Sequence, residues 1–212
     1  MMDIVSKTTE IRPGFVQTSY NRRGTRNILL LFDVKRGAEL PHHKHVHHQF
    51  GYTFSGEYTF IIDDAHYHSG PRHSYLIEGD IYHSAIALSD YYSMDFKFTA
   101  QGRLTERVQF GLLPNTPRTN TERRDIPFHT DSGTVLVRHL HGGGVAPPFA
   151  GTELGERLLV VSRDGDVTIN GTTEKFEAMK IYRLHTRDTL DVRLQSSDHE
   201  AFIYECTDCE CV

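Results

Sequence analysis

Histidine is concentrated in one short stretch of the sequence, and its spacing is suited to binding a metal ion. The chain has 14 histidines, and five of them lie among the seven residues from 42 to 48. His43 and His45 are separated by one residue, so in an extended segment their side chains project to the same side. Gln49 can return to that side at the start of the next strand, and His83 could complete the set from a neighbouring strand. These four side chains form a candidate site for one divalent metal ion.

A solvated histidine-rich loop that picks up metals loosely is the alternative explanation of this stretch. Gly56 permits a tight turn at the end of the next strand, and a loose tract would require neither the flanking glycines Gly37 and Gly56 nor the distant His83. The remaining histidines of the run are offset by one residue from the candidate ligands, so strand alternation turns them away from the site. We therefore expect exposed or rim positions for His42, His47 and His48.

The pattern resembles the two motifs of the cupin superfamily. Gly37, five residues, His-x-His, three residues, Gln49, six residues and Gly56 match the first motif, with Gln in place of the usual Glu. The segment Glu78-Gly-Asp-Ile-Tyr-His83 is similar to the second motif, Pro-x-Gly-x-x-His, and has Asp80 in place of the glycine. Asp tolerates the left-handed backbone conformation better than most residues, so the turn can survive. A bicupin isomerase of the kind found in bacilysin biosynthesis carries a similar ligand pattern. This resemblance implies a metal bound by His43, His45, Gln49 and His83.

Strand-like segments fill the chain in two sets. Short runs rich in β-branched and aromatic residues recur between turn signals, and helical periodicity never extends beyond about two turns. The first set covers 28–35, 50–54, 58–62, 73–77, 83–88 and 92–98; the second covers 134–140, 157–162, 166–169, 180–184, 189–194 and 201–205. The sets look like a repeat offset by roughly 107 residues, in which the turn at Asp63-Asp64 matches the turn at Asn170-Gly171.

Repeat and resemblance together predict an all-β bicupin, with two tandem cupin barrels of the double-stranded β-helix or jelly-roll type. Each set has enough strands to close a barrel and remove exposed edges. We expect a first barrel with the metal site at 1–100, a linker at 101–130, a second barrel at 131–205 and a cysteine-containing tail at 206–212. One larger sandwich is the competing interpretation.

The ligand set indicates Lewis-acid chemistry. Three imidazoles and an amide oxygen are neutral, so they leave the full charge of the ion available to an anionic oxygen, as in a keto acid or an enolate. Such mixed ligands suit Fe, Mn, Co, Ni or Zn. We expect an enzyme of the isomerase or lyase type acting on a small oxygenated keto or enol substrate; the alternatives are an Fe(II) dioxygenase and a non-catalytic small-molecule-binding cupin.

A general base should lie on the inner face of the first barrel. Tyr52 and Tyr82 are the candidate catalytic residues, and His68 and Asp95 are further candidates. Asp95 points inward only if the neighbouring Phe96 and Phe98 point outward, and we expect the reverse because aromatic side chains favour a core.

The second half lacks an evident ligand set. If Gly165 matches Gly56, counting back seven residues places Leu158 at the position of Gln49. We therefore expect a vestigial second barrel that binds no metal. The rival hypothesis is a rearranged site, whose candidate ligands are His139, His141, Glu153 or Glu156, and His185.

Composition limits the classes of binding partner and the cellular location that we expect. A net charge of -5 argues against nucleic acid, and no apolar run approaches the roughly 18 residues of a membrane span. The start of the chain lacks the pattern of a signal peptide. The three cysteines of the chain are confined to its tail: Cys206, Cys209 and Cys211. We therefore expect a cytoplasmic protein without a disulfide framework. The resemblance to cupins suggests a possible homodimer.

Overall fold

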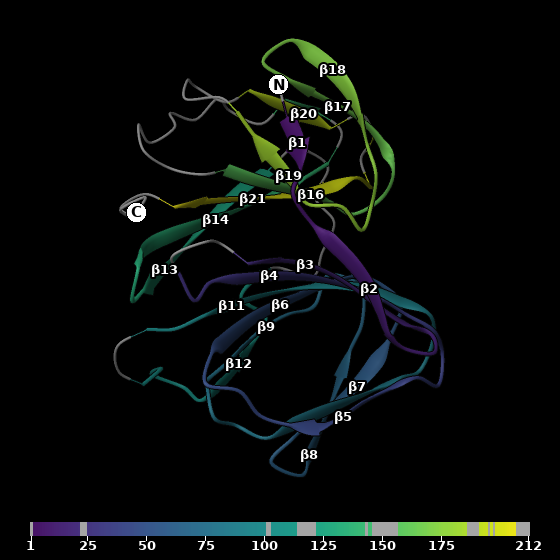
Figure 1. The fold of residues 1–212 in the computed structure, drawn as a ribbon, viewed down its shortest axis with the longest axis vertical. Helices are drawn as coiled ribbons and strands as arrows, with labels where there is room; N and C mark the ends of the chain where they lie inside the picture. Colours follow the sequence, from purple (N-terminus) through teal and green to yellow (C-terminus); the bar gives the residue numbers. More distant parts are fainter. Residues whose placement is uncertain are drawn as a thin grey trace. The chain divides into compact units, whose positions relative to one another are not determined.

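The protein is built from β-strands arranged in two compact units. The computed structural model describes residues 2–21, 25–100, 103–113, 122–142, 144–145, 157–185, 191–194, 196 and 198–206, and all regular elements of this part are strands (Figure 1). One unit is Lys7–Thr116, and the other combines Met1–Ser6 with Pro117–Val212. Over the described residues, no helix has the length and apolar character that crossing a bilayer requires.

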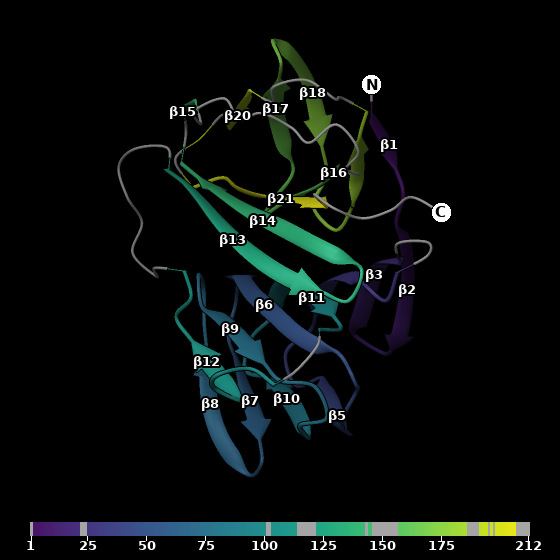
Figure 2. The ribbon, with the colours of Figure 1, turned by 90° about the vertical axis from the view of Figure 1, so that its left-hand side faces the viewer.

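The first unit contains two antiparallel sheets. Its seven-stranded sheet has the order β12-β9-β6-β11-β4-β3-β2, with strands β2 (Lys7–Arg12), β3 (Phe15–Asn21), β4 (Ile28–Val34), β6 (His48–Ser55), β9 (Ser74–Ile77), β11 (Tyr91–Phe98) and β12 (Val108–Phe110). Its four-stranded sheet has the order β5-β10-β7-β8, with strands β5 (Glu39–His43), β7 (Tyr58–Ile62), β8 (Ala65–Ser69) and β10 (His83–Ala87). Figure 2 shows β9, β6 and β11 side by side in the larger sheet.

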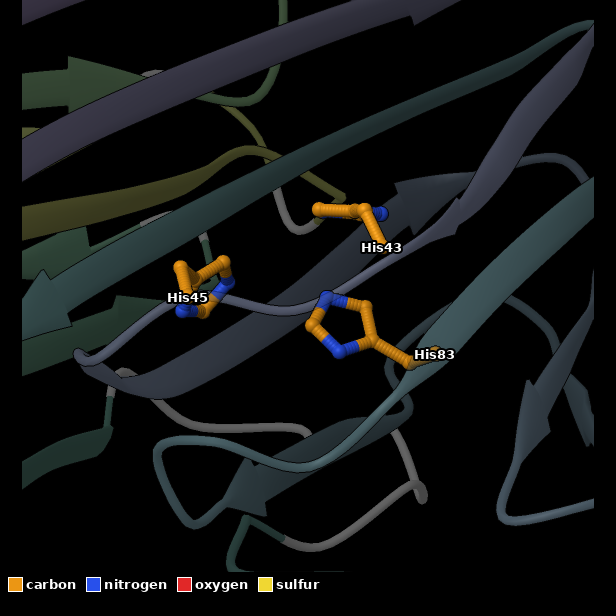
Figure 3. A group of neighbouring side chains, drawn as sticks. All are labelled: His43, His45 and His83. Atoms are coloured by element: carbon orange, nitrogen blue, oxygen red, sulfur yellow. The ribbon is translucent and has the colours of Figure 1, made fainter.

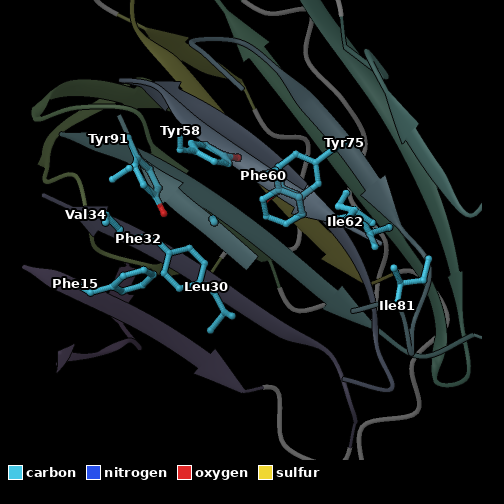
Figure 4. Packing of buried hydrophobic residues seen from close by; sticks show 13 residues of the cluster. Phe15, Leu30, Phe32, Val34, Tyr58, Phe60, Ile62, Tyr75, Ile81 and Tyr91 are labelled. Atoms are coloured by element: carbon cyan, nitrogen blue, oxygen red, sulfur yellow. The ribbon is translucent and has the colours of Figure 1, made fainter. Parts of the chain in front are cut away.

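The core of the first unit lies between these two sheets, because alternate residues of each strand face inward. Leu30, Phe32 and Val34 come from β4, and Tyr58 and Phe60 come from β7 of the opposite sheet (Figure 4). All five side chains are buried. The packed interior holds the two sheets together by removing apolar surface from water.

The second unit repeats the same plan. Its six-stranded sheet has the order β1-β19-β16-β21-β14-β13, with strands β1 (Met2–Ile4), β13 (Glu122–Thr130), β14 (Gly133–His141), β16 (Arg157–Val161), β19 (Tyr182–Leu184) and β21 (Glu200–Cys206). Its four-stranded sheet has the order β15-β20-β17-β18, with strands β15 (Gly144–Val145), β17 (Gly165–Ile169), β18 (Thr172–Phe176) and β20 (Val192–Leu194). The core includes Leu140, Leu159, Val167, Phe176 and Ile203.

The two units are related strand for strand. Strands β3 to β11 of the first unit correspond to strands β13 to β21 of the second. Corresponding strands have the same order in the sheets of both units. At the sheet edge, β1 pairs with β19 as β12 pairs with β9 (Figure 1). The turn after β7 has positive φ angles at Asp63 and Asp64, and the turn after β17 has them at Asn170 and Gly171. The predicted all-β tandem barrels are therefore confirmed, and the offset of 107 residues holds at this turn.

The boundaries of the units differ from those expected from the sequence. Strand β12 and strand β13 both fall in the stretch 101–130 that we expected to be a linker, and each completes the edge of a sheet. The first residues of the chain belong to the second unit through β1. Residues 114–121, in the middle of the expected linker, lie outside the described part of the chain.

Candidate metal centre

Three histidines meet at one point of the first unit. His43 ends β5 and is the cross-strand partner of His83, the first residue of β10, while His45 follows in the loop after β5. Ring centroids lie 4.4 Å apart for His43 and His83, and 5.0 Å apart for His45 and His83. One nitrogen from each ring lies within 4.8 Å of the others, so one ion could contact all three (Figure 3). The two strands and the loop thus bring together the histidines predicted from the sequence.

The turn before β10 holds this loop in place. Asp80 has φ +62°, as expected where an aspartate replaces the motif's glycine. Its backbone N–H donates to the carbonyl of His45 at 2.8 Å. At Gly79 a Cβ atom would lie 2.3 Å from the carbonyl oxygen of Val46, so only glycine allows the turn to approach this closely. The second motif therefore positions both His83 and His45.

Backbone carbonyls fix the tautomer of all three imidazoles. The Nδ1–H groups of His43, His45 and His83 each donate to a carbonyl oxygen at 2.9 Å, from Pro41, His47 and Ile81 respectively. A carbonyl can only accept, so the proton of each neutral ring sits on Nδ1 and the lone pair is on Nε2. The Nε2 atom of His83 is buried and has no hydrogen-bond partner among the described residues. This arrangement of ring nitrogens is typical of histidines that ligate a metal.

Gln49 brings a fourth donor atom to the same point. Its Oε1 lies 2.9 Å from Nε2 of His45, and its amide nitrogen donates to Oδ2 of Asp95 at 2.9 Å. The lone pair of His45 therefore faces the lone pairs of an amide oxygen, a contact that is repulsive unless a cation lies next to both atoms. A divalent ion bound by both would remove this repulsion, so the residues present fit a metal ion.

Burial keeps these histidines neutral. It lowers the pKa of His83 to about 3 and is the main cause that lowers the pKa of His45 to about 4. The pKa of His43 is lowered mainly by burial as well, and the positive charge of Lys97 contributes to all three shifts. At neutral pH the three rings therefore have free lone pairs and need not lose a proton to bind a metal.

Two charged residues of β11 face the barrel interior beside the ligands. Lys97 pairs with Gln49 in the strand register, and Asp95 lies two residues away on the same face. Burial raises the pKa of Asp95 to about 6 and lowers the pKa of Lys97. Our expectation that Phe96 and Phe98 face inward was wrong: their rings stack on each other on the opposite face. Both faces of this strand are buried, so its composition did not reveal which one lines the barrel.

The space beneath Gln49 is narrow. A cavity of about 20 Å³ is lined by both polar and aromatic side chains, including Gln49, Asp95, Tyr58, Tyr75 and Phe60. This volume has room for about one water molecule. The cluster is therefore open to solvent on the side of His43 and His45, which are half-buried, whereas Gln49 and His83 are buried.

The candidate bases have different positions. Tyr52 lies three residues after Gln49 in β6, so its side chain leaves the opposite face, and its ring contacts Phe54. Tyr82 is 46% exposed and stacks on the ring of His42. The structure does not bring Tyr52 to the histidines, whereas Tyr82 occupies the exposed rim.

The remaining histidines of this unit lie outside the cluster. His42 is exposed, as expected, and His47 is half-buried. The expectation of exposure was wrong for His48, which is buried and accepts a hydrogen bond at Nδ1 from the backbone N–H of Gly79. His68, a further candidate base, is exposed on β8, and its ring contacts that of His73.

The second unit has ion pairs where the first has ligands. Arg157 is the first inward-facing residue of β16, as Gln49 is of β6, and it donates to buried Glu205 at 3.0 Å. Our assignment of Leu158 to this position was one residue late, because Gly165 is the first residue of β17 whereas Gly56 forms the turn before β7.

The rival ligands of this unit do not assemble into such a site among the described residues. His139 and His141 both face Glu200, with nitrogen–oxygen distances of 3.3 and 3.7 Å. His185 lies 2.6 Å from a carboxylate oxygen of Asp3. Within the part of the chain that the structure describes, His43, His45 and His83 form the only compact cluster of three such ligands. Other expected residues lie outside the described part: Glu153, Glu156, Cys209 and Cys211.

The sequence matches a known domain family in the region of the site. Residues 30–95 match the cupin domain family. They include all four candidate ligands. No curated protein matches the sequence significantly.

Solved structures share the fold over nearly the whole chain. AerE from Microcystis aeruginosa is 15% identical, with a TM-score of 0.63 over 96% of this chain and 97% of that protein. The pirin YhhW from Escherichia coli, in complex with nickel(II), is 11% identical, with a TM-score of 0.73 over 98% and 99% of the two chains. Oxalate decarboxylase from Bacillus subtilis, which has Mn(II) centres, is 10% identical, with a TM-score of 0.59 over 100% of this chain and 78% of that one. At these identities the similarity establishes a shared tandem-barrel fold.

Proposed function

From the premise that this chain carries a cupin domain and has the bicupin fold, we propose that it is a metal-dependent enzyme. His43, His45, Gln49 and His83 would hold one divalent transition metal ion, drawn from Fe, Mn, Co, Ni or Zn. The observation that carries this proposal is the 2.9 Å contact between Nε2 of His45 and Oε1 of Gln49, two atoms that both present lone pairs. The nickel(II) of the pirin and the Mn(II) of oxalate decarboxylase, on the same fold, support a divalent ion.

The charge around the site favours an anionic, oxygen-rich substrate. All four ligands are neutral, and the positive charge of Lys97 acts on the candidate ligand His45. When bound, the metal supplies a Lewis acid that polarises a carbonyl or carboxylate oxygen. Lys97 would bind the negative end of the substrate, and the narrow interior would keep bulk water from the inner side. A small keto acid or its enolate suits this arrangement.

We infer a reaction of the isomerase or lyase type, in which a proton is moved next to a carbonyl. Of the two tyrosine candidates, Tyr82 lies at the exposed rim, where its ring stacks on His42, and it stays the candidate for proton transfer. The reaction would take place in the cytoplasm, and the protein would act alone or as a homodimer.

Metal content tests the site. Purified protein should contain close to one metal ion per chain, and His83→Ala should lower this to near zero. His42→Ala is the matched control, because His42 is a neighbour of the same run that stacks on Tyr82 outside the cluster. Loss of metal in the control, or its retention in the His83 variant, would contradict the proposal.

Isotope exchange and oxygen uptake test the reaction. The metal-loaded protein should exchange the protons next to the carbonyl of small keto acids in deuterated water, as followed by NMR. His83→Ala should lose this exchange. Consumption of dioxygen with keto acids or catechols would point to the dioxygenase instead, and binding without either reaction would point to a small-molecule-binding cupin.

A further inference from the structure

A buried network lies directly behind Gln49. The amide nitrogen of Gln49 donates to Oδ2 of Asp95 at 2.9 Å, and the hydroxyl of Tyr75 donates to Oδ1 of the same carboxylate at 2.7 Å. Gln49 is 2% exposed and Asp95 is 5% exposed, so water does not replace these contacts. Both oxygens of Asp95 are thus held, and one of them meets the amide of a candidate ligand.

A glutamine ligand has a requirement that a glutamate ligand lacks. The two ends of an amide have almost the same shape, but only the oxygen can bind a cation, whereas the NH₂ group presents two donors. A rotated amide would turn its NH₂ group toward His45 and the metal. The two oxygens of a carboxylate are equivalent, so the usual glutamate needs no such control.

We propose that Asp95 is the positioning residue that makes Gln49 a metal ligand. Its carboxylate can only accept hydrogen bonds from the amide, so it holds the NH₂ group of Gln49 and leaves Oε1 directed at His45. This inference rests on the proposed metal site. It explains how this chain can carry glutamine where most cupin motifs have glutamate.

Gly51 supports the arrangement independently. It is the register partner of Asp95 on one side and of Tyr75 on the other, so it lies between them in the sheet. A Cβ atom at this position would lie 1.9 Å from the ring and 2.3 Å from the hydroxyl of Tyr75. The missing side chain therefore lets the Tyr75 ring lie across β6 and reach Asp95. Strand β6 thus lacks a side chain at the position that the ring of Tyr75 occupies.

Metal affinity in a double-mutant cycle tests the proposal. Asp95→Leu removes the acceptor at similar size and should weaken metal binding about 10- to 100-fold, the usual effect of losing a partner behind a ligand. Asp95→Asn keeps an amide oxygen that can accept from Gln49, so it should stay close to the wild type. In a Gln49→Leu background, Asp95→Leu should cause no further loss, because it acts through Gln49. Competition with a chromophoric chelator measures the affinity, and the visible spectrum of bound Co(II) reports the ligand set.

Several results would overturn this role. They are an unchanged affinity in Asp95→Leu, an equal loss in Asp95→Asn, or an undiminished loss in the Gln49→Leu background. The thermal unfolding of the metal-free variants serves as the control for folding. If Asp95→Leu does not fold, Gly51→Ala takes its place: it should weaken metal binding by displacing Tyr75, and an unchanged affinity would contradict the proposal. Absence of metal from the wild-type protein would instead refute the proposed function.

Discussion

At the scale of single residues, the backbone decides how the histidines can act. A histidine-rich sequence leaves either ring nitrogen available, but here the carbonyls of Pro41, His47 and Ile81 each take an Nδ1–H. The Nε2 atoms are therefore the ones that converge. All three acceptors are only two residues from their histidine, in the segments that lead into and out of the site. The local chain path thus prepares the ligands before any metal binds.

The histidines also predict how metal-free protein responds to acid. Burial lowers the pKa of His83 to about 3 and, as its main cause, the pKa of His45 to about 4, against an ordinary value of 6.5. Between pH 6.5 and about 4, the unfolded chain binds protons that the folded chain does not, so the free energy of unfolding falls as pH falls. Asp95, with a pKa raised to about 6 by burial, acts in the opposite sense and offsets part of this loss.

Urea unfolding of metal-free protein between pH 7 and pH 4.5 measures this dependence. The midpoint should fall with pH in the wild type and fall less in His83→Asn, in which one titrating ring is missing. A midpoint independent of pH, or a steeper fall in the variant, would show that the buried rings do not control the acid response.

Because Lys97 is positively charged, we expect the candidate site to bind anions in preference to uncharged molecules. Lys97→Met keeps the aliphatic stem but removes the charge, so it should weaken binding of a small keto acid by about tenfold or more, since a hydrogen bond to a charged group contributes about 1.5–3 kcal/mol. Binding of an uncharged diketone should not change. Calorimetric titration of metal-loaded protein measures both affinities. Lys175→Met, at an exposed site on β18 of the second unit, is the control; equal effects in the two variants would count against a role in the site.

The sequence predicts the ligands better than it predicts their surroundings. The spacing of His43, His45 and Gln49 is local, so recognising it does not depend on a correct prediction of the fold. The structure brings these side chains together with His83. Of the neighbours from β11, Lys97 was missed and Asp95 was a candidate that we expected to point outward, because inward and outward residues of this strand are buried alike. The signal that was available is that Asp95 and Lys97 alternate with aromatic residues, since two charges on one face need a polar interior.

At the scale of elements, the strands that were predicted differ from those that were missed in what they bury. All twelve expected strands are present within a few residues, and most have an apolar face in a core. Missed strands such as β2, β5, β8 and β18 are largely exposed and polar. Their pairing partners, not their own side chains, keep them in a sheet, so no hydrophobic alternation reveals them.

The turn at Asp80 gives a prediction about backbone conformation. Asp80→Gly should change the free energy of unfolding by less than about 1 kcal/mol, because glycine adopts a positive φ readily but makes the unfolded chain more flexible. Asp80→Val should lower it by about 1–3 kcal/mol, since a β-branched residue is strained at φ +62°. Chemical denaturation of metal-free protein measures both changes.

Metal affinity should follow the same order. The backbone N–H of Asp80 holds the carbonyl of His45, so the valine variant should bind metal more weakly than the glycine variant. Equal stability and equal affinity in the two variants would mean that the turn adapts without cost.

At the scale of the whole molecule, the two units share one architecture but differ in the residues at its centre. The strand orders of the two units match, yet the inward position of Gln49 in the first is taken by Arg157 in the second. Glu205 accepts from Arg157 and from Arg138, and all three lie on the faces that line the second core. Guanidinium groups thus bring positive charge to a position where the first unit gathers metal ligands. We therefore expect one metal ion per chain, and two tightly held ions would contradict this.

The same ion pairs predict which of two variants of the second unit is less stable. Glu205→Leu leaves two buried guanidinium groups without their shared carboxylate, so it should lower the free energy of unfolding of the second unit by about 3–5 kcal/mol. Arg157→Met should cost less, because Arg138 still pairs with Glu205 at 3.2 Å. Hydrogen exchange of amides in β16 and β21 measures the stability of this unit, and metal content reports on the first. If the pairs serve only the second core, Glu205→Leu should speed exchange there while the protein keeps its single metal ion; slow exchange in this variant would show that the network is dispensable.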